Sequence, residues 1–417
     1  MKKKFVIIVL VISFFKVGAQ TSAFKTIDSL VTFGRYQKAL SLLKKMPSGV
    51  AANLKTATIY ASVDNHKMAS MYYRKALLLT DDYRTKIKLG KSYQKEKKLH
   101  KAIEVFEEIV SSDTDNSLIN YQLGKLYLQT KQAKKAVVVF KSLIKNDTEN
   151  ANYNYQLGVA YALLKKRDLK INSFLTAYDK DAEHIKSIYQ LALAFTKLRD
   201  KDSAAIFINR GVEVKPNHIE LNKLKINNLY RNKDYLSAVF LLEKIDSLLP
   251  NEHYTKKMLG RSFLKLKDYE NAKINFNSAT RLDDEDFKSY KYLGDIELEQ
   301  KNYSKARMYY RFATFIGRKK RDIEYYQLGI VFKKMNKPKE EMDAYKEAFK
   351  QNFKNYRALY QWATTTENFY KDKRIAYKQY KKYMDRFETK DSLLTVQVKS
   401  RLKEIKKYYF LKGEVLN

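Results

Sequence analysis

Residues that could carry out catalysis or bind a metal do not form a recognisable site in this sequence of 417 residues. There is no cysteine, which excludes disulfides and thiolate metal sites. No glycine-rich phosphate loop occurs, and no two histidines have the His-x-x-x-His spacing of a metal site. The five histidines are His66, His100, His184, His218 and His253. We therefore predict a protein that is not an enzyme, with no catalytic residues, no metal site and no cofactor.

A pair of residues suited to binding recurs along the chain. Tyrosine offers a large contact area at a low entropy cost and carries a polar tip, and the neighbouring glutamine adds both a hydrogen-bond donor and an acceptor. The five pairs are Tyr121-Gln122, Tyr155-Gln156, Tyr189-Gln190, Tyr326-Gln327 and Tyr360-Gln361.

A second recurring feature is basic charge. The formal net charge is +36, which favours anionic partners. Seven basic residues are spaced by thirty-four positions without a miss: Lys97, Lys131, Lys165, Arg199, Lys233, Lys267 and Lys301. Two other interpretations stay open. A genome rich in lysine codons would give the same composition, and a cation at a helix C-terminus is stabilised locally by about 0.3–1 kcal/mol.

The elements that position these residues follow a fixed period. One unit carries Leu123, Gly124 and Tyr127, followed by Ala136 and Phe140, and its segment NYQLG recurs thirty-four residues later. In this order and period the chain resembles tetratricopeptide repeat (TPR) proteins. The resemblance implies an all-α fold: a right-handed superhelical solenoid of about ten to eleven helical hairpins, each with a helix A and a helix B.

The repeat frame extends over residues 20–388, with three departures from its packing pattern. Lys170 and Glu341 replace the small residue between the helices, and Glu297 stands where an aromatic residue is expected. A small residue is needed where two helix backbones approach closely. We therefore expect looser packing at Lys170.

Residues 389–417 lie outside the repeat frame. From Asp391, apolar residues follow at helical spacing, and the opposite face is basic. We interpret this segment as a C-terminal capping helix and tail, because an open solenoid end exposes an apolar face. The alternative is a helix that lies on an anionic membrane surface.

The first nineteen residues have the pattern of a secretory signal peptide. A lysine-rich start precedes an apolar run of eleven residues, Phe5–Phe15, and small residues lead to a cleavage site after Ala19. Such a run is too short to span a bilayer, which needs about 20 residues. We expect export to the periplasm or an outer-membrane-associated location. Lipid anchoring through a cysteine is excluded, and no transmembrane segment is expected in the mature chain.

The TPR resemblance suggests where the recurring residues lie. In this family the helix A position that the tyrosines occupy often faces the concave groove, so the Tyr-Gln pairs would form a ladder that stacks on a partner segment. The alternative is that the tyrosines only pack between neighbouring A helices. The groove differs from the carboxylate clamp that grips chaperone tails, because Lys91, Lys125 and Val159 stand where that clamp needs asparagine.

The seven basic residues fall at the turn between helix A and helix B, where the family often has glycine, and would form one basic edge. From these features we predict a non-enzymatic protein-binding scaffold or adaptor of the bacterial cell envelope. Its partner would be a protein or peptide segment held in the concave groove. The alternative is an envelope component that binds anionic glycan or lipid through the basic edge. Export argues against nucleic acid as a partner.

Overall fold

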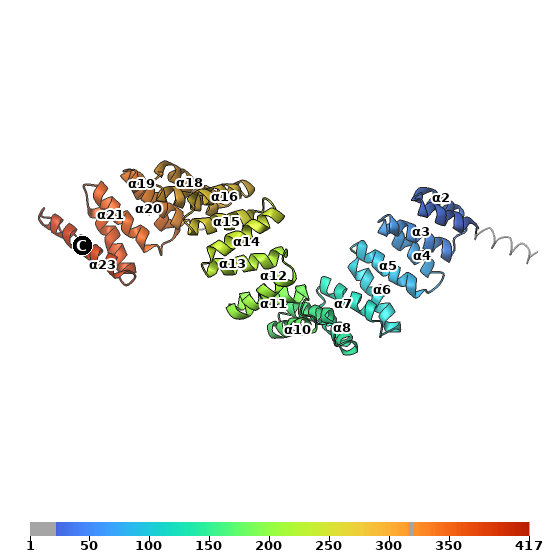
Figure 1. Ribbon diagram of the computed structural model, residues 1–417. Helices are drawn as coiled ribbons and strands as arrows, with labels where there is room; N and C mark the ends of the chain where they lie inside the picture. Colours follow the sequence, from blue (N-terminus) through green and yellow to red (C-terminus); the bar gives the residue numbers. More distant parts are fainter. Residues whose placement is uncertain (1–21, 317–320, 417) are drawn as a thin grey trace, which may run out of the picture. The chain divides into compact units, whose positions relative to one another are not determined.

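The structure is a computed structural model that describes residues 22–316 and 321–416 (Figure 1). Within these ranges all regular structure is α-helical and no strand occurs. This confirms the predicted all-α fold of repeated hairpins. The predicted signal peptide, residues 1–19, lies outside the described residues and stays a prediction.

The chain divides into two compact units, Met1–Lys215 and Pro216–Asn417. In the first unit, residues 22–32 are helical. They are followed by α2 (Tyr36–Lys45), α3 (Val50–Ser62), α4 (His66–Leu77), α5 (Tyr83–Lys95), α6 (Leu99–Ser112), α7 (Ser117–Gln129), α8 (Ala133–Asn146), α9 (Ala151–Leu163), α10 (Arg167–Lys180), α11 (Ile185–Leu198) and α12 (Lys201–Val214).

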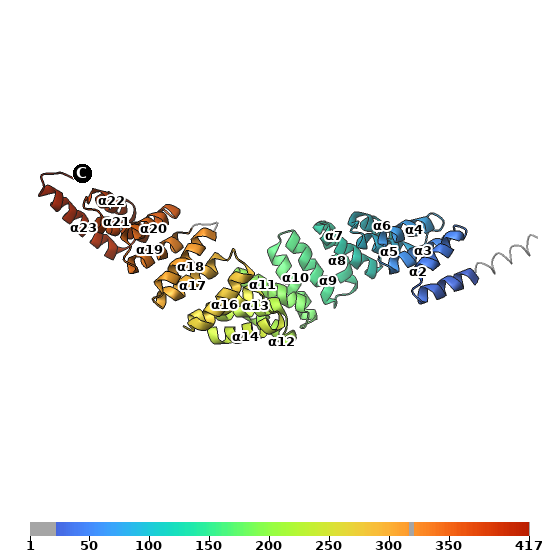
Figure 2. The same cartoon turned by 90° about the horizontal axis from the view of Figure 1, so that it is seen from above.

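The second unit continues the same alternation of A and B helices. It contains α13 (Ile219–Arg231), α14 (Tyr235–Leu248), α15 (His253–Lys265), α16 (Tyr269–Leu282), α17 (Phe287–Glu299), α18 (Tyr303–Ile316), α19 (Asp322–Lys334), α20 (Pro338–Gln351), α21 (Tyr356–Phe369), α22 (Arg374–Phe387) and α23 (Ser392–Phe410). Within each unit, consecutive helices pack side by side (Figures 1 and 2).

Several hairpins carry a glycine in helix A at the position of Gly124. In each of these hairpins a buried aromatic ring of helix B lies against that glycine. A Cβ added to Gly124 would lie 2.6 Å from Cζ of Phe140, and one added to Gly158 would lie 2.5 Å from Cε1 of Phe174. Real Cβ atoms do not approach carbon so closely, so a larger residue would displace the ring. We predicted that a small residue is needed because two helix backbones approach closely. The structure shows that the aromatic ring of the residue sixteen positions later occupies the space next to the glycine.

Close packing persists where we expected it to loosen at Lys170. Phe174, one turn further along α10, is 1% exposed and its ring lies against Gly158. Ile171 is also buried. The packing prediction at Lys170 was therefore wrong for the helix pair, because the aromatic ring and not the small residue fills the interface. Lys170 is half-buried and borders a cavity.

The other two departures from the repeat pattern are buried carboxylates with hydrogen-bond donors. Asn302 Nδ2 donates to Glu297 at 2.8 Å, and the hydroxyl of Thr365 donates to Glu341 at 2.8 Å. Both glutamates are less than a tenth exposed. Buried polar groups are tolerated when they are paired in this way.

Candidate binding surfaces

In the first unit the Tyr-Gln pairs connect one repeat to the next. The ring of Tyr121 on α7 lies 5.7 Å from that of Tyr153 on α9 and 6.1 Å from that of Phe140 on α8, measured between centroids. The side chain of Gln156 donates a long hydrogen bond of 3.4 Å to the hydroxyl of Tyr121. Tyr121 therefore packs between neighbouring A helices, and it also stays partly exposed.

Tyr155 on α9 is held in a similar way. Its ring lies 5.6 Å from Phe174 and 5.3 Å from His184, which is the N-cap residue of α11. Burial raises the pKa of the Tyr155 hydroxyl, so this group stays protonated at neutral pH and can donate a hydrogen bond. The next pair, Tyr189 and Gln190 on α11, is half-buried as well.

In the second unit three predicted site residues line one cavity. Tyr326 of α19 and the adjacent Tyr360 and Gln361 of α21 border a space of about 390 Å³. The start of α23 forms the other wall through Leu393 and Gln397. Gln327 is half-buried but does not line this cavity. The structure thus brings together Tyr326, Tyr360 and Gln361.

This cavity combines aromatic, polar and charged side chains. The hydroxyl of Tyr360 donates to Oε1 of Gln397 at 2.7 Å. Burial raises the pKa of the Tyr326 hydroxyl, which therefore stays neutral. Arg357 and Asp391 place one positive and one negative charge at its border, and Leu393 is 77% exposed. Such a surface can make apolar contacts and hydrogen bonds with one partner segment.

The sequence analysis missed three residues that occupy the tyrosine position in later repeats. Thirty-four residues beyond Tyr189 the tyrosine series continues as Lys223, Lys257 and Lys291. All three lysines form ion pairs. Lys223 pairs with Glu220 and Glu252, Lys257 pairs with Asp286, and Lys291 pairs with Asp295. The unchanged period was the signal that could have found them. The tyrosine ladder is therefore interrupted in the second unit by paired charges.

The seven residues of the predicted basic edge share a left-handed backbone conformation. Their φ angles lie between 58° and 65°, and all seven side chains are exposed. Four belong to the first unit and three to the second. The corresponding turn carries Gly34, Asp64 or Asn336 in other hairpins, also with positive φ. The structure confirms that these basic residues occupy the turn before helix B.

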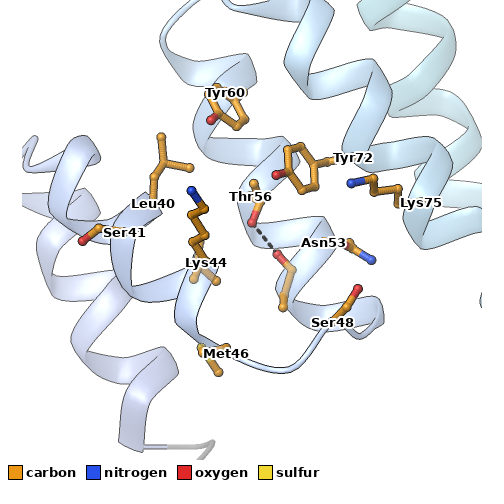
Figure 3. A pocket seen from close by; sticks show the side chains of 12 residues that line it. Leu40, Ser41, Lys44, Met46, Ser48, Asn53, Thr56, Tyr60, Tyr72 and Lys75 are labelled. Carbon is orange, nitrogen blue, oxygen red and sulfur yellow. Dashed lines mark hydrogen bonds between the residues drawn. The ribbon is translucent and has the colours of Figure 1, made fainter.

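A further cavity of about 330 Å³ lies between α2, α3 and α4 (Figure 3). The rings of Tyr60 and Tyr72 stack on its wall with centroids 5.8 Å apart, and the ammonium group of Lys75 lies 4.8 Å from the Tyr72 ring. The hydroxyl of Thr56 is occupied by a 2.8 Å bond to the carbonyl of Ala52. This cavity is again aromatic and polar.

The residues that the structure describes, 22–316 and 321–416, contain neither a candidate metal site nor a helix that could cross a membrane. Three or more acidic or histidine side chains do not gather anywhere in these ranges in a way that could hold a metal ion. None of the helices described there has the length and apolar character needed to cross a membrane.

Comparison with known proteins identifies the repeats. Tetratricopeptide repeat models match residues 93–157, 185–218 and 257–316, and a PPR repeat model matches residues 27–49. The three matches follow the helical hairpins described above and occur in both compact units. The chain therefore contains tetratricopeptide repeats in both of its compact units.

Several solved structures are similar. MamA from Desulfovibrio magneticus is 20% identical, with 39% of this chain and 97% of that chain covered and a TM-score of 0.35. YrrB, described as a TPR protein with an unusual peptide-binding site, is 19% identical, with 46% and 97% covered and a TM-score of 0.36. The Cut9-Hcn1 hetero-tetramer of the APC/C gives 13% identity, 90% and 83% coverage and a TM-score of 0.42. No curated protein sequence matches the chain.

Proposed function

We propose that this protein is a non-enzymatic scaffold or adaptor that binds a segment of a partner protein through its tyrosine-bearing A helices. The observation that carries the proposal is the cavity at which Tyr326, Tyr360 and Gln361 meet the start of α23. Two tyrosine hydroxyls and an amide there can accept or donate hydrogen bonds without requiring a charged partner. Aromatic anchors of this kind carry much of the energy in protein interfaces.

The partner is proposed to be an extended or helical peptide segment. The tyrosines recur on successive A helices, at Tyr121, Tyr155 and Tyr189 in the first unit and at Tyr326 and Tyr360 in the second. A row of anchors along parallel elements fits a linear segment better than a compact small molecule. Four of these rings already pack against an aromatic ring of their own repeat, so little side-chain entropy would be lost on binding: Tyr121, Tyr155, Tyr326 and Tyr360.

We further propose that the protein works in the bacterial cell envelope, in the periplasm or at the outer membrane. This rests on the signal-peptide pattern of residues 1–19. Fractionation of the source cells, with mass spectrometry of the mature N-terminus, tests it. An N-terminus at Gln20 in the envelope fraction is expected, and an intact Met1 in the cytosolic fraction would disprove export.

The binding proposal is tested by capture of envelope proteins on the purified chain. Replacement of Tyr326 and Tyr360 by alanine should weaken capture of the partner by about 30-fold or more, since each anchor is worth about 1–2 kcal/mol. The same two residues changed to phenylalanine keep the ring packing and should lose less. A helical circular dichroism signal equal to that of the wild type shows that the variant is folded.

The matched control reverses charge in the same unit, by Lys267→Glu with Lys301→Glu. If this variant fails to bind while the tyrosine variant binds normally, the groove proposal is wrong. The second candidate then takes its place: an envelope protein that binds anionic glycan or lipid through the basic edge. The observation that favours this candidate is the row of exposed basic turn residues.

A further inference from the structure

One cavity of the first unit is bordered by an unusual number of cations. It has a volume of about 420 Å³ and lies where the turn between α9 and α10 meets the end of α11. Five basic side chains line it: Lys165, Lys166, Arg167, Lys170 and Lys197. The tyrosine pairs do not line this cavity, so its role is independent of the peptide binding proposed above; Lys165 also belongs to the basic edge.

Almost none of this charge is neutralised by the protein. Arg167 pairs with the neighbouring Asp168, at 3.0 Å, and both side chains are largely exposed. In the part of the chain that the structure describes, none of the four lysines has an ion pair with a carboxylate. Several cations around one concave surface raise the local concentration of anions.

The preceding repeat shows that the cluster is not a by-product of the period. Thirty-four residues before the five cavity cations stand Lys131, Gln132, Ala133, Ala136 and Leu163, so only one cation is present there. A general preference for lysine would be expected to act on both repeats alike. The following repeat carries three cations and one acidic residue at these positions: Arg199, Asp200, Lys201, Ala204 and Arg231. Of these three repeats, the one with the α9–α10 hairpin therefore has the highest concentration of positive charge.

Of the five basic residues that line the cavity, Lys170 is the one that is half-buried. Neighbouring repeats carry a buried alanine at this position, Ala136 and Ala204. Lys170 is half-buried, unlike Lys165 and Lys197, which are exposed. A lysine that is partly withdrawn from water interacts with a bound anion more strongly than a fully solvated one.

The remaining wall of the cavity is apolar. Tyr161 and Ile171 are buried in the hairpin and contribute part of their surface, and Leu198 is 43% exposed. A space of about 420 Å³ exceeds what a single inorganic anion fills, and it lies within the range of about 300–1,000 Å³ typical of small-ligand pockets. The ligand should therefore join an anionic group to an apolar body.

We propose that this cavity binds a phosphate monoester whose phosphate contacts Lys165, Lys170 and Lys197 and whose apolar body lies against Tyr161 and Leu198. A phosphate monoester carries about two negative charges at pH 7 and three strong acceptor oxygens. It therefore matches a cluster of several lysines better than a carboxylate, which carries one charge. Lysine acts as a point charge in such sites.

The test is isothermal titration calorimetry of the purified full chain with phenyl phosphate. We expect saturable binding at one site. The pocket variant Lys165→Gln, Lys170→Ala, Lys197→Gln should bind at least tenfold more weakly. Lys170→Ala introduces the residue that neighbouring repeats carry, so that single variant should fold normally and should already weaken binding about threefold. Phenol, which lacks the phosphate, should not bind.

The matched control removes the same charge from the preceding repeat, by Lys131→Gln, Lys134→Gln and Lys141→Gln, all exposed residues. It should bind within about twofold of the wild type. Equal weakening in both triple variants would show a diffuse charge effect and overturn the proposal, as would the absence of phenyl phosphate binding to the wild type.

A second arm distinguishes the source of the phosphate. Vesicles of phosphatidylcholine containing phosphatidic acid present the same monoester on a membrane. If they bind the wild type and not the pocket variant, the ligand is a lipid headgroup. If phenyl phosphate binds through the pocket while these vesicles do not bind, the ligand is a soluble ester. Both results support the site.

Discussion

At the scale of single residues, the basic turn positions stand out because their backbone is strained. Seven lysine or arginine residues have φ angles of 58–65°, a conformation that costs a residue with a side chain about 1–2 kcal/mol. Glycine avoids this cost, and Gly34 occupies the corresponding turn of the first hairpin. The interaction of a cation with a helix C-terminus stabilises the fold by only about 0.3–1 kcal/mol, which is less than this cost. The retained side chains therefore support a role beyond the local backbone.

This strain predicts an unusual result for one substitution. Lys131→Gly should raise the free energy of unfolding by about 0.5 kcal/mol, because relief of strain exceeds the loss of chain entropy. Lys131→Val should lower it by more than about 1 kcal/mol, because a β-branched residue tolerates positive φ poorly. Urea unfolding measures both. As a control, Lys134→Gly within α8 should be destabilising by about 1 kcal/mol; equal losses for the two glycine variants would refute the argument.

At the scale of elements, α23 is fastened to the last hairpin by both apolar and polar contacts. Val398, Ile405 and Tyr409 are buried against it. The hydroxyl of Tyr409 donates to Oδ1 of Asp372 at 2.6 Å and accepts from the backbone N–H of Lys373 at 2.9 Å. The side chain of Asp391 accepts a hydrogen bond from the backbone N–H of Leu394 and so caps the first turn of α23.

Removal of α23 tests whether it closes the array. Truncation after Glu388 should expose Tyr380 and Tyr383, both fully buried in the intact chain, and should promote aggregation. Light scattering during heating measures this. Leu393→Ser changes an exposed residue of the same helix and should leave solubility unchanged. A truncated chain as soluble and heat-resistant as the intact one would show that α23 is no cap.

A second element-scale prediction concerns the start of α17. The side chain of Asp286 is 3% exposed and accepts hydrogen bonds from Lys257, His253 and Ser289. Burial alone would raise the pKa of this carboxyl, but the bonds from Lys257 and Ser289 outweigh it and lower the pKa below its ordinary value of 3.8. Ionised Asp286 therefore stabilises the fold above about pH 4. This contribution is lost as the pH falls through the lowered pKa.

Asp286→Asn should accordingly lower the free energy of unfolding at pH 7 by about 1–3 kcal/mol. The difference from the wild type should begin to shrink below about pH 4, where the unfolded chain takes up the proton, and should disappear as the pH falls through the lowered pKa of the folded state. Urea unfolding at pH 7 and pH 3 measures it. Asp284→Asn, a change at an exposed neighbour, should have little effect at either pH. A loss for Asp286→Asn that is equally large at pH 3 would argue against a contribution from the charge.

At the scale of the whole molecule, the net charge of +36 separates the two proposed modes of binding. Electrostatic attraction between exposed charges is screened over about 8 Å at physiological ionic strength and over shorter distances at higher salt. Capture of a peptide segment by the tyrosines should therefore weaken only a few-fold between 50 and 500 mM sodium chloride. Binding of a polyanion such as dextran sulfate should collapse over the same range. A protein partner whose binding also collapses would favour the basic edge as the contact surface.

The sequence by itself determined the repeated helical hairpins. The Leu-Gly…Tyr…Ala…Phe order depends on contacts within one hairpin, between residues such as Gly124 and Phe140 that lie sixteen positions apart. The apolar periodicity of each helix and the N-cap residue Asp391 are local signals too. Such short-range patterns survive in a single sequence, which is why the all-α fold and the start of the last helix were predictable.

Only the tertiary structure decided how the recurring side chains are used. The contact of Gln156 with Tyr121 and the cavity shared by Tyr326, Tyr360 and Gln397 join residues of different repeats. The period places such residues on neighbouring helices, but it does not give the rotamers and helix spacing that bring them together. The cationic cavity at Lys170 has the same origin. Its charges come from the ends of three helices, and their convergence depends on packing between repeats.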